Sequence, residues 1–426
     1  MKNLNIGLCG LGTVGKGVVD LLKKNASAIT AGTGVALNLS AIGVRRKNPA
    51  YQTGDIPLIM DIFTLTERPD IDVIVELIGG TTTAKTLIIQ AMQRGKHVVT
   101  ANKALIAEHG NELFALAAKQ GVMLAYEAAV AGGIPIIKLL KEGLIANNLH
   151  TISGIINGTC NFILTEMLRQ QGSFATILQQ AQDKGYAEAD PSFDIDGIDA
   201  AHKIAICASL AFGMPLAYDK VYREGIRHID LADIHYASEL GYKIKHLAIA
   251  RRTDKHLSLS VYPALIKQDH PLANIERERN ALFIQGEPIG DLLVTGAGAG
   301  SGPTASAVVA DLVDFARHQG VYRQEDYLVE HGKENLHIVD MMQDHHAFYL
   351  RMEAKNEAGV LAKITRVLAQ KQINIESIVQ KEHHQGNAHI VVITNPVGEQ
   401  KFRACLNLIQ EAAYMISVKA VRVHVA

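Results

Sequence analysis

An acidic segment that ends in a lysine carries the strongest chemical pattern of the chain: GYAEADPSFDIDGIDAAHK, residues 185–203. Asp199 and Lys203 lie four residues apart in a predicted helix, so their side chains share one helix face. An exposed pair with this spacing would be an ordinary surface ion pair, which contributes roughly a few tenths of a kcal/mol. The rest of this helix is largely apolar, with Ile204 and Leu210 among its residues, which predicts burial. A buried lysine that faces carboxylates is typical of a group tuned for proton transfer.

A second lysine follows a predicted strand. Lys103 comes directly after the apolar run HVVTAN, residues 97–102. In an open parallel sheet, the carboxyl ends of the strands form the crevice in which ligands bind. We therefore expect Lys103 to meet a substrate or a cofactor there; the alternative is a lysine without a role.

The third pattern is a glycine-rich turn, GLGTVG, between the predicted strand LNIGLCG and a predicted helix. Glycines in a strand–turn–helix unit allow a tight turn and a close approach to the pyrophosphate of a dinucleotide. The helix N-terminus adds unpaired N–H donors. A plain tight turn is the alternative. The predicted cofactor-binding residues of this turn are Gly10, Leu11, Gly12, Thr13, Val14 and Gly15.

The second predicted strand, LNLSAIGV, does not end in the carboxylate that would bind the ribose 2′-hydroxyl of NAD. Val44, Arg45 and Arg46 stand there instead. Guanidinium groups form strong, often bidentate bonds with phosphate, and a 2′-phosphate distinguishes NADP from NAD. The pattern favours NADP(H), with NAD(H) still possible; a solvated basic loop is the alternative.

These residues need a scaffold, and residues 1–145 predict one. Short apolar strands alternate with helical segments, which indicates parallel βαβ units and a doubly wound α/β sheet of the Rossmann type. The carboxyl ends of its strands would place the glycine turn, Arg45, Lys103 and Glu127 on one edge. Predicted strands occupy residues 4–10, 37–44, 72–79, 97–103 and 122–130.

The remaining sequence predicts two further domains. Residues 146–320 read as a strand, then long helical stretches, then strands over 257–295, which indicates an α+β domain. A second glycine-rich turn, TGAGAGSGPT, suggests that the chain returns to the cofactor domain at about 296–320. The polar residues 321–347 are predicted to be a linker. Residues 348–426 have the order βαββαβ, a ferredoxin-like unit.

Composition excludes several classes of protein. The 426 residues carry a net charge of −1 at pH 7, so no overall basic field is expected to attract nucleic acid or a membrane surface. No apolar run approaches the roughly 20 residues that span a bilayer, and the first run breaks at Gly10, unlike a signal peptide. The four cysteines form no CxxC pair, which is typical of free thiols in a reducing compartment, so we expect a cytoplasmic protein. The histidines lack the spacing of metal ligands.

Together, these motifs resemble the homoserine dehydrogenase family in its long form with a C-terminal ACT domain. The resemblance covers nearly the whole chain, and it departs from the family pattern at Cys160, where threonine is more common. It implies a Rossmann domain at 1–145, a catalytic and dimerisation domain at 146–320 and an ACT regulatory domain at 348–426. The motifs that carry it are GLGTVG at 10–15, TANKALIA at 100–107, YEAAVAGGIPII at 126–137, GIINGTCNFILT at 154–165, the acidic segment at 185–203 and GAGAGSGPTASAVVAD at 296–311.

The resemblance assigns roles to individual residues. The lysine that matches Lys203 is the acid/base at the reacting oxygen. The positions of Glu188 and Asp199 bind the amino-acid substrate, and Asp194 belongs to the same pocket. The position of Lys103 contacts both cofactor and substrate.

Further positions are implied around the cofactor and at two other sites. Gly185 and Gly300 fall where the nicotinamide side of the cofactor is lined. The family also binds a monovalent cation, usually Na⁺, through the backbone of the segment that matches Glu127, Val130, Gly132 and Ile134. The ligand loop of ACT domains often reads D-x-P-G-V-L, whereas residues 356–361 read NEAGVL. The implied effector-binding residues are Asn356, Gly359 and Val360.

The resemblance implies a reversible NAD(P)H-dependent reduction of L-aspartate 4-semialdehyde to L-homoserine. The reaction belongs to threonine, methionine and isoleucine biosynthesis, which makes threonine the favoured feedback effector. The expected assembly is a homodimer or a homotetramer, and an ACT domain that only pairs subunits is the alternative to an effector site.

Three other functions compete with this reading. A Rossmann protein that only senses NADP(H) would lack an acid/base group, and the cluster around Lys203 argues against it. An amino-acid-binding regulator could be built on the C-terminal unit alone. Aspartate semialdehyde dehydrogenase would need a catalytic thiolate, for which Cys160 is the candidate.

Overall fold

The computed structural model describes residues 2–46, 53–318, 336–383 and 386–424. The chain forms two compact units, and each is described by itself. The first unit comprises residues 1–152, 199–219 and 279–336. The second unit comprises residues 153–198, 220–278 and 337–426.

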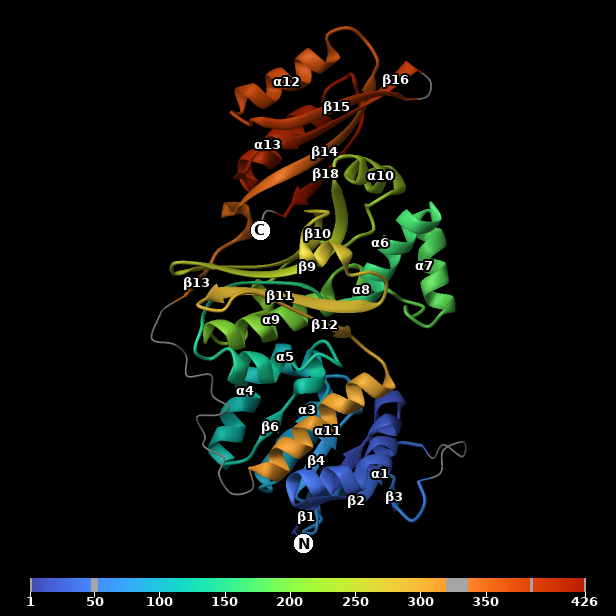
Figure 1. The fold of residues 1–426 in the computed structure, drawn as a ribbon, viewed down its shortest axis with the longest axis vertical. Helices are drawn as coiled ribbons and strands as arrows, with labels where there is room; N and C mark the ends of the chain where they lie inside the picture. Colours follow the sequence, from blue (N-terminus) through green and yellow to red (C-terminus); the bar gives the residue numbers. More distant parts are fainter. Residues whose placement is uncertain (1, 47–52, 319–335, 384–385, 425–426) are drawn as a thin grey trace. The chain divides into compact units, whose positions relative to one another are not determined.

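A six-stranded sheet is the centre of the first unit (Figure 1). Its strand order is β3-β2-β1-β4-β5-β6, and each neighbouring pair is parallel. The predicted doubly wound parallel sheet is therefore confirmed, and the carboxyl ends of its strands meet at one edge. The strands are β1 (Lys2–Cys9), β2 (Val35–Gly43), β3 (Leu58–Ile59), β4 (Val73–Glu76), β5 (His97–Thr100) and β6 (Leu124–Ala125).

Helices connect these strands. The helix after β1 packs Val18, Val19 and Leu22 into the core of the sheet and ends at Gly34, whose φ of 72° suits a helix terminus. The helices and short helical turns of this part are α1 (Thr13–Thr33), α2 (Thr64–Glu67), α3 (Thr82–Gln93), α4 (Lys103–Gln120), η1 (Glu127–Ala129), α5 (Ile136–Lys138) and η2 (Leu139–Gly143).

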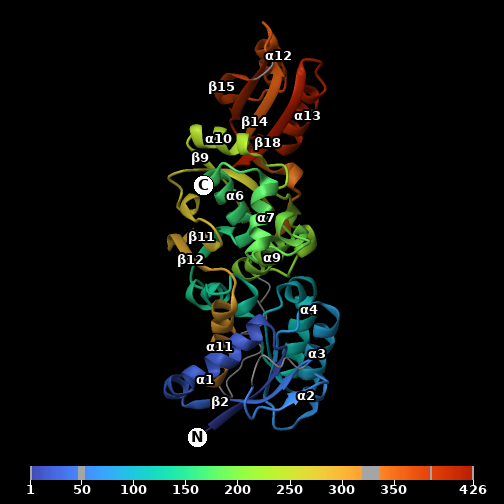
Figure 2. The same cartoon turned by 90° about the vertical axis from the view of Figure 1, so that its right-hand side faces the viewer.

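Three later segments complete the first unit. One of them, α11, lies alongside α1, as Figure 1 and Figure 2 show. A methyl group on Gly17 of α1 would stand 2.7 Å from the Ser301 carbonyl oxygen, so glycine permits this close packing. Val308 and Leu312 of α11 enter the core of the sheet. The three segments are α9 (Ile198–Phe212), the hairpin of β11 (Arg279–Glu287) and β12 (Gly290–Ala297), and α11 (Ser301–Arg317).

The strand predicted over 122–130 is wrong in its length. Only Leu124–Ala125 is a strand, because the chain turns at Glu127. The Glu127 N–H donates to Asp311 at 3.0 Å, and the Glu127 carboxylate accepts from the backbone N–H groups of Ile137 and Lys138 at 2.9 and 2.8 Å. These bonds take the place of sheet pairing.

A long antiparallel hairpin organises the second unit. It consists of β9 (Tyr242–Thr253) and β10 (His256–Lys267), and the sequence predicted only its second strand. The buried Lys245 interrupts the apolar pattern of β9 in the sequence. Its ammonium donates to Asn161 at 3.1 Å and to the Ile275 carbonyl. The helices of this part are α6 (Gly158–Gln170), α7 (Phe174–Asp183), α8 (Ser192–Ile195) and α10 (Leu231–Glu239), and β7 (Asn148–Ile155) leads into it.

The second edge of β10 is shared by three short parallel partners. Near its start it pairs with β13 (His337–Ile338), in its middle with β8 (Tyr222–Arg223), and near its end with the last two residues of β18 (Met415–Val423). The C-terminal strand β18 therefore pairs with the same edge of β10 as β8 and β13 do.

The C-terminal part of the second unit confirms the predicted βαββαβ order. Its sheet has the order β18-β14-β16-β15, with antiparallel neighbours (Figure 1). The elements are β14 (His345–Lys355), α12 (Val360–Gln370), β15 (Ile375–His383), β16 (Asn387–Thr394), β17 (Val397–Gly398), α13 (Glu399–Gln410) and β18 (Met415–Val423).

Both faces of this C-terminal sheet are buried. On one face, Phe348 packs with Ile364 of α12 and Phe402 of α13. On the other face, Tyr349 belongs to the same core as Ile234 of α10. The C-terminal sheet thus shares a core with the rest of the second unit.

The predicted segment boundaries differ from the structure at two places. Residues 321–335 of the predicted linker lie outside the described residues, but 336–347 contain β13, η6 (Met341–Gln343) and the start of β14. Asp344 there accepts hydrogen bonds from Arg251 and Ser258 at 2.6 and 2.9 Å, so this part is tied to the hairpin. The segment predicted as one domain, 146–320, is divided between the two units. No helix among the described residues could cross a bilayer.

Candidate active site

The glycine turn leads from β1 into α1 and lines a cavity of about 540 Å³. Gly10 has a φ of 106°, and a methyl group on it would lie 2.5 Å from the Leu77 carbonyl oxygen. A methyl group on Gly15 would overlap the Gly10 carbonyl oxygen. Gly12, in contrast, has no neighbour within 4 Å at the position of a Cβ. Two glycines therefore shape the turn, and the third leaves the cavity open, as a bound pyrophosphate requires.

The far wall of this cavity is basic. Val44 is buried, while Arg45 and Arg46 are exposed and line the cavity. Among the described residues, neither arginine side chain forms a hydrogen bond or an ion pair with another side chain. The guanidinium groups are therefore available to a phosphate, and no carboxylate lines the described wall of the cavity.

Sequence reasoning missed Glu76, the last residue of β4. Its side chain is fully buried and accepts from the backbone N–H groups of Ile78 and Gly79 at 2.8 and 3.1 Å. The Thr100 hydroxyl also donates to it at 2.6 Å. Glu76 thus fixes the loop at the cavity wall, and its signal in the sequence is a carboxylate inside an otherwise apolar strand.

The second glycine-rich turn reaches the first one. Gly300 has a φ of 114° at the start of α11, and the Ser301 hydroxyl donates to the Thr13 carbonyl at 2.8 Å. The N-termini of α1 and α11 therefore lie side by side in the first unit. Sequence reasoning had not identified Ser301 as the contact between them.

Two lysines converge on one buried carboxylate in the same unit. Lys103 Nζ lies 2.7 Å from Asp199 Oδ1, and Lys203 Nζ lies 2.7 Å from Asp199 Oδ2. The side chains of Asp199 and Lys203 are 3% and 10% exposed, whereas that of Lys103 is 33% exposed. Burial alone would raise the pKa of Asp199, but the two ammonium groups hold it well below its usual range. Asp199 therefore carries a negative charge between two positive ones.

Helix ends and helix spacing produce this arrangement. Lys103 is the first residue of α4, whose N-cap Asn102 accepts from the Leu105 N–H at 3.2 Å. Asp199 and Lys203 lie one turn apart near the start of α9, as predicted. The prediction that these residues share a face of a buried helix is confirmed.

The loop after β6 presents carbonyl groups rather than free carboxylates. The Glu127 carboxylate is occupied by two backbone N–H groups, and burial raises its pKa. Ala131 and Gly132 both have positive φ, at 53° and 41°, which turns successive carbonyl groups in different directions. Carbonyl oxygens are suitable ligands for a hard cation, so the segment fits the implied cation through its backbone. Among the described residues, no cluster of three or more His, Cys, Asp or Glu side chains could hold a metal ion.

Glu188, Asp194 and Gly185 lie in the second unit. Glu188 is exposed, and Gly185 has a φ of 73°. The Asp194 carboxylate accepts from Asn157 at 2.8 Å and from the Thr159 hydroxyl at 3.3 Å. The structure therefore does not place these residues with Lys203 in one described site.

Cys160 does not have the exposure of a catalytic thiolate. It is fully buried, and its Sγ donates to the Asp194 carbonyl at 3.3 Å. A nucleophilic thiol needs access to substrate and a positive neighbourhood. This geometry does not support the semialdehyde dehydrogenase alternative.

The predicted effector loop precedes α12. Gly359 has a φ of 88° at the N-cap of that helix, and no atom lies within 4 Å of a Cβ built on it. Asn356 is exposed and Val360 is buried. The left-handed backbone explains why glycine stands there.

These features define a dinucleotide-dependent oxidoreductase with an appended ACT-type unit. Comparisons with known proteins agree. Residues 10–127 match the family model described as homoserine dehydrogenase, NAD binding domain, residues 135–313 match the one described as homoserine dehydrogenase, and residues 348–413 match the ACT domain.

Individual relatives extend this agreement over the full chain. A homoserine dehydrogenase from Pseudomonas aeruginosa is 48% identical, with 100% of this chain and 99% of the relative covered. The crystal structure of a homoserine dehydrogenase from Thiobacillus denitrificans is 44% identical with a TM-score of 0.94, covering 100% of this chain and 99% of that one. A hyperthermophilic archaeal homoserine dehydrogenase in complex with NADPH is 27% identical with a TM-score of 0.63, covering 73% and 97%. The chain belongs to the homoserine dehydrogenase family.

Proposed function

We propose that this chain interconverts L-homoserine and L-aspartate 4-semialdehyde with NADP(H). The observation that carries the proposal is the pairing of Lys103 and Lys203 with the buried Asp199, in the same unit as the open glycine turn. Membership of the homoserine dehydrogenase family indicates the proposed substrate, and Lys203 would be the proton donor. When bound, the nicotinamide ring would supply or accept the hydride.

Lys203 is the proposed general acid. During reduction, the aldehyde oxygen develops negative charge, and the Lys203 ammonium donates a proton to it; during oxidation, the neutral amine takes the proton back. Asp199 holds the ammonium at 2.7 Å and so fixes its direction. Lys103 is more exposed and is proposed to contact both substrate and cofactor.

Carboxylates of the acidic segment are proposed to recognise the amino-acid end of the substrate. As the family resemblance implies, Glu188 and Asp199 would bind its ammonium group, and Asp194 would belong to the same pocket. Both oxygens of Asp199 also contact lysines, so Asp199 would orient these lysines as well.

NADP(H) is the proposed cofactor because Arg45 and Arg46 line the cavity without competing partners among the described residues. The archaeal relative named above was solved with NADPH, which supports this choice. Gly185 and Gly300 would line the nicotinamide side. NAD(H) would bind with lower affinity, because it lacks the 2′-phosphate.

A monovalent cation is proposed at the loop after β6. Backbone carbonyls of Glu127, Val130, Gly132 and Ile134 would hold it. Activity in Na⁺ buffer compared with a buffer of a bulky organic cation tests this assignment.

We further propose feedback inhibition by threonine through Asn356, Gly359 and Val360, in an enzyme of threonine, methionine and isoleucine biosynthesis that works as a homodimer or homotetramer. An open helix N-terminus after Gly359 suits a carboxylate. Unchanged activity of the full chain at millimolar threonine, together with no binding by calorimetry, would argue for a purely assembling ACT domain.

The experiment for the main proposal is an initial-rate assay of the purified full chain with homoserine and either NADP⁺ or NAD⁺. We expect homoserine-dependent NADPH formation and a lower KM for NADP⁺ than for NAD⁺. No turnover with either cofactor would contradict the proposal.

A further inference from the structure

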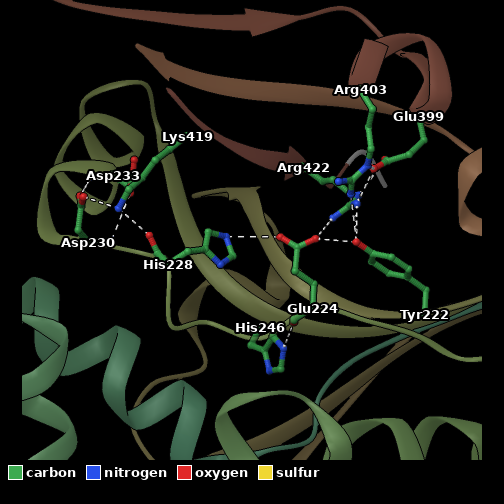
Figure 3. Close-up of polar contacts among 10 residues, drawn as sticks. All are labelled: Tyr222, Glu224, His228, Asp230, Asp233, His246, Glu399, Arg403, Lys419 and Arg422. Atoms are coloured by element: carbon green, nitrogen blue, oxygen red, sulfur yellow. Dashed lines mark hydrogen bonds and ion pairs between the residues drawn. The ribbon is translucent and has the colours of Figure 1, made fainter. Parts of the chain in front are cut away.

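A buried polar network in the second unit lies outside the residues assigned above (Figure 3). At its centre is Arg422 of β18, which is 3% exposed. Its Nε and Nη2 donate to the two carboxylate oxygens of Glu399 at 3.0 and 2.6 Å, and its Nη1 donates to Glu224 at 2.7 Å. One guanidinium therefore joins the first residue of α13 to the chain segment that follows β8.

Arg422 has two hydrogen-bond partners in the segment 222–224: the Glu224 carboxylate, and the Tyr222 hydroxyl at 3.1 Å. The Tyr222 hydroxyl also donates to Glu224 at 2.9 Å, and His228 Nε2 lies 3.4 Å from the Glu224 carboxylate. Burial opposes its ionisation, but the positive charge of Arg422 holds the pKa of Glu224 below its usual range. The Glu224 side chain is half-buried, at 24% exposed, and its ion pair with Arg422 and its hydrogen bond from Tyr222 hold residue 224 in position.

The residues directly after Glu224 contact the acidic segment through the backbone. A methyl group on Gly225 would overlap the Ile195 carbonyl oxygen and stand 2.8 Å from Asp196 Cα. The Ile226 N–H donates to the same Ile195 carbonyl at 2.9 Å. The position of residues 225–226 therefore sets the position of the end of α8.

A side-chain contact completes the connection. Arg227 donates through Nε and Nη2 to both oxygens of Asp196 at 2.6 and 3.0 Å, and through Nη2 to the Ser192 hydroxyl at 2.9 Å. Ser192 begins α8, the short helix that carries Asp194. Both ends of α8 are thus held by residues 225–227.

We propose that Arg422, acting through Glu224 and residues 225–227, is a positioning residue for the acidic segment that carries Asp194. The last strand of the ACT domain then sets the geometry of the substrate-binding loop through the ion pair of Arg422 with Glu224. This inference rests on the proposed function, in which the segment binds the amino-acid end of the substrate.

The test uses Glu224→Gln in the full chain, which keeps the side-chain size and removes the charge that Arg422 binds. We expect the KM for homoserine to rise about 5- to 10-fold, with kcat within about twofold of the native value and the KM for NADP⁺ unchanged. Arg403→Gln is the matched control. Arg403 binds the same Glu399 and Tyr222, at 2.8 and 3.1 Å, from a side chain that is 43% exposed. It should leave the homoserine KM at its native value.

A second variant guards against a general folding defect. Arg227→Gln changes a side chain that is 50% exposed and removes its contacts to Asp196 and Ser192, while the Arg422–Glu224 pair stays intact. It should also raise the homoserine KM, and its effect should be less than additive with that of Glu224→Gln, because both act on the same loop.

Hydrogen exchange provides a readout that does not depend on the reaction. Amides of residues 194–197 should exchange faster in Glu224→Gln than in the native chain or in Arg403→Gln. Native exchange and a native homoserine KM in Glu224→Gln would overturn the inference, and so would faster exchange with an unchanged KM. An equal rise of KM in Arg403→Gln would also overturn it. Asp194→Asn separates the proposed substrate role of the loop from the proposed positioning role of Arg422. A native homoserine KM in that variant would show that the loop does not bind the substrate.

Discussion

Asp199 is the residue on which the two lysines of the site converge. Both of its oxygens lie 2.7 Å from an ammonium group, and its side chain is 3% exposed. Asp199→Asn should lower turnover about 10- to 100-fold, because Lys203 loses the charge that orients it for proton transfer. Glu112→Gln is the control, since Glu112 pairs with Lys85 at 2.7 Å on an exposed surface. Equal turnover of the two variants would contradict the role of Asp199.

Arg45 and Arg46 carry the predicted cofactor preference at the same scale. Replacing both with alanine should raise the KM for NADP⁺ about 10- to 100-fold and hardly change that for NAD⁺. Losing hydrogen bonds to a charged phosphate costs roughly 1.5–3 kcal/mol. Arg68→Ala, which removes a half-buried arginine paired with Asp70, serves as the control in steady-state assays. A parallel rise for both cofactors would show that these arginines do not read the 2′-phosphate.

At the scale of elements, the contact between α1 and α11 brings two glycine-rich turns together. Gly17→Val should separate these helices, because even a methyl group there meets Ser301 and Ala305. We expect a loss of about 1–3 kcal/mol in the free energy of unfolding and weaker NADP(H) binding. Gly32→Ala in the same helix has no neighbour within 4 Å and should be neutral or stabilising in urea unfolding. Unchanged affinity for NADP(H) in Gly17→Val would show that the contact between α1 and α11 does not affect cofactor binding.

Local patterns explain which elements could be predicted. The glycine turn, the parallel strands and the Asp199–Lys203 face follow from spacings of a few residues, and the structure has them. β9 was missed because a buried lysine, held by Asn161, interrupts its apolar pattern. The shortening of β6 depends on Asp311, far along the chain, which binds the Glu127 N–H. Lys103 and Asp199 meet across almost 100 residues, a contact that no local pattern could specify.

At the scale of the whole molecule, buried and half-buried histidines link stability to pH. Burial lowers the pKa of His97 in the first unit to about 4, and likewise that of His346 and His424 in the second unit. Because the folded chain keeps these rings neutral, the unfolded chain binds more protons below about pH 6.5. Stability is therefore present above pH 6.5 and should fall as the pH decreases from about 6.5 to about 4.

His97→Gln tests this dependence. Glutamine can still accept the Met123 N–H that His97 Nδ1 accepts at 2.9 Å. Its free energy of unfolding in urea should fall less between pH 7 and pH 4.5 than that of the native chain, by roughly 1–3 kcal/mol. Glutamine at the exposed His256 should keep the native profile. A native profile in His97→Gln would show that this ring does not contribute.

Residues 348–426 share a core with the rest of the second unit. The sequence predicts a regulatory domain that follows a linker, but the structure gives its sheet a second buried face against α10 and the neighbouring residues Ile226 and Ile229. Deleting residues 348–426 would expose this core, so effects of a ligand on activity are best measured in the full chain.

The most direct measurement is the enzyme kinetics of a variant with one substitution at Lys203, since Lys203 is the proposed proton donor. In Lys203→Ala, homoserine oxidation at saturating NADP⁺ should fall by about 100-fold or more, while the dissociation constant for NADPH, measured by fluorescence, stays within about threefold of the native value. A variant that binds NADPH normally and retains near-native turnover would contradict the account.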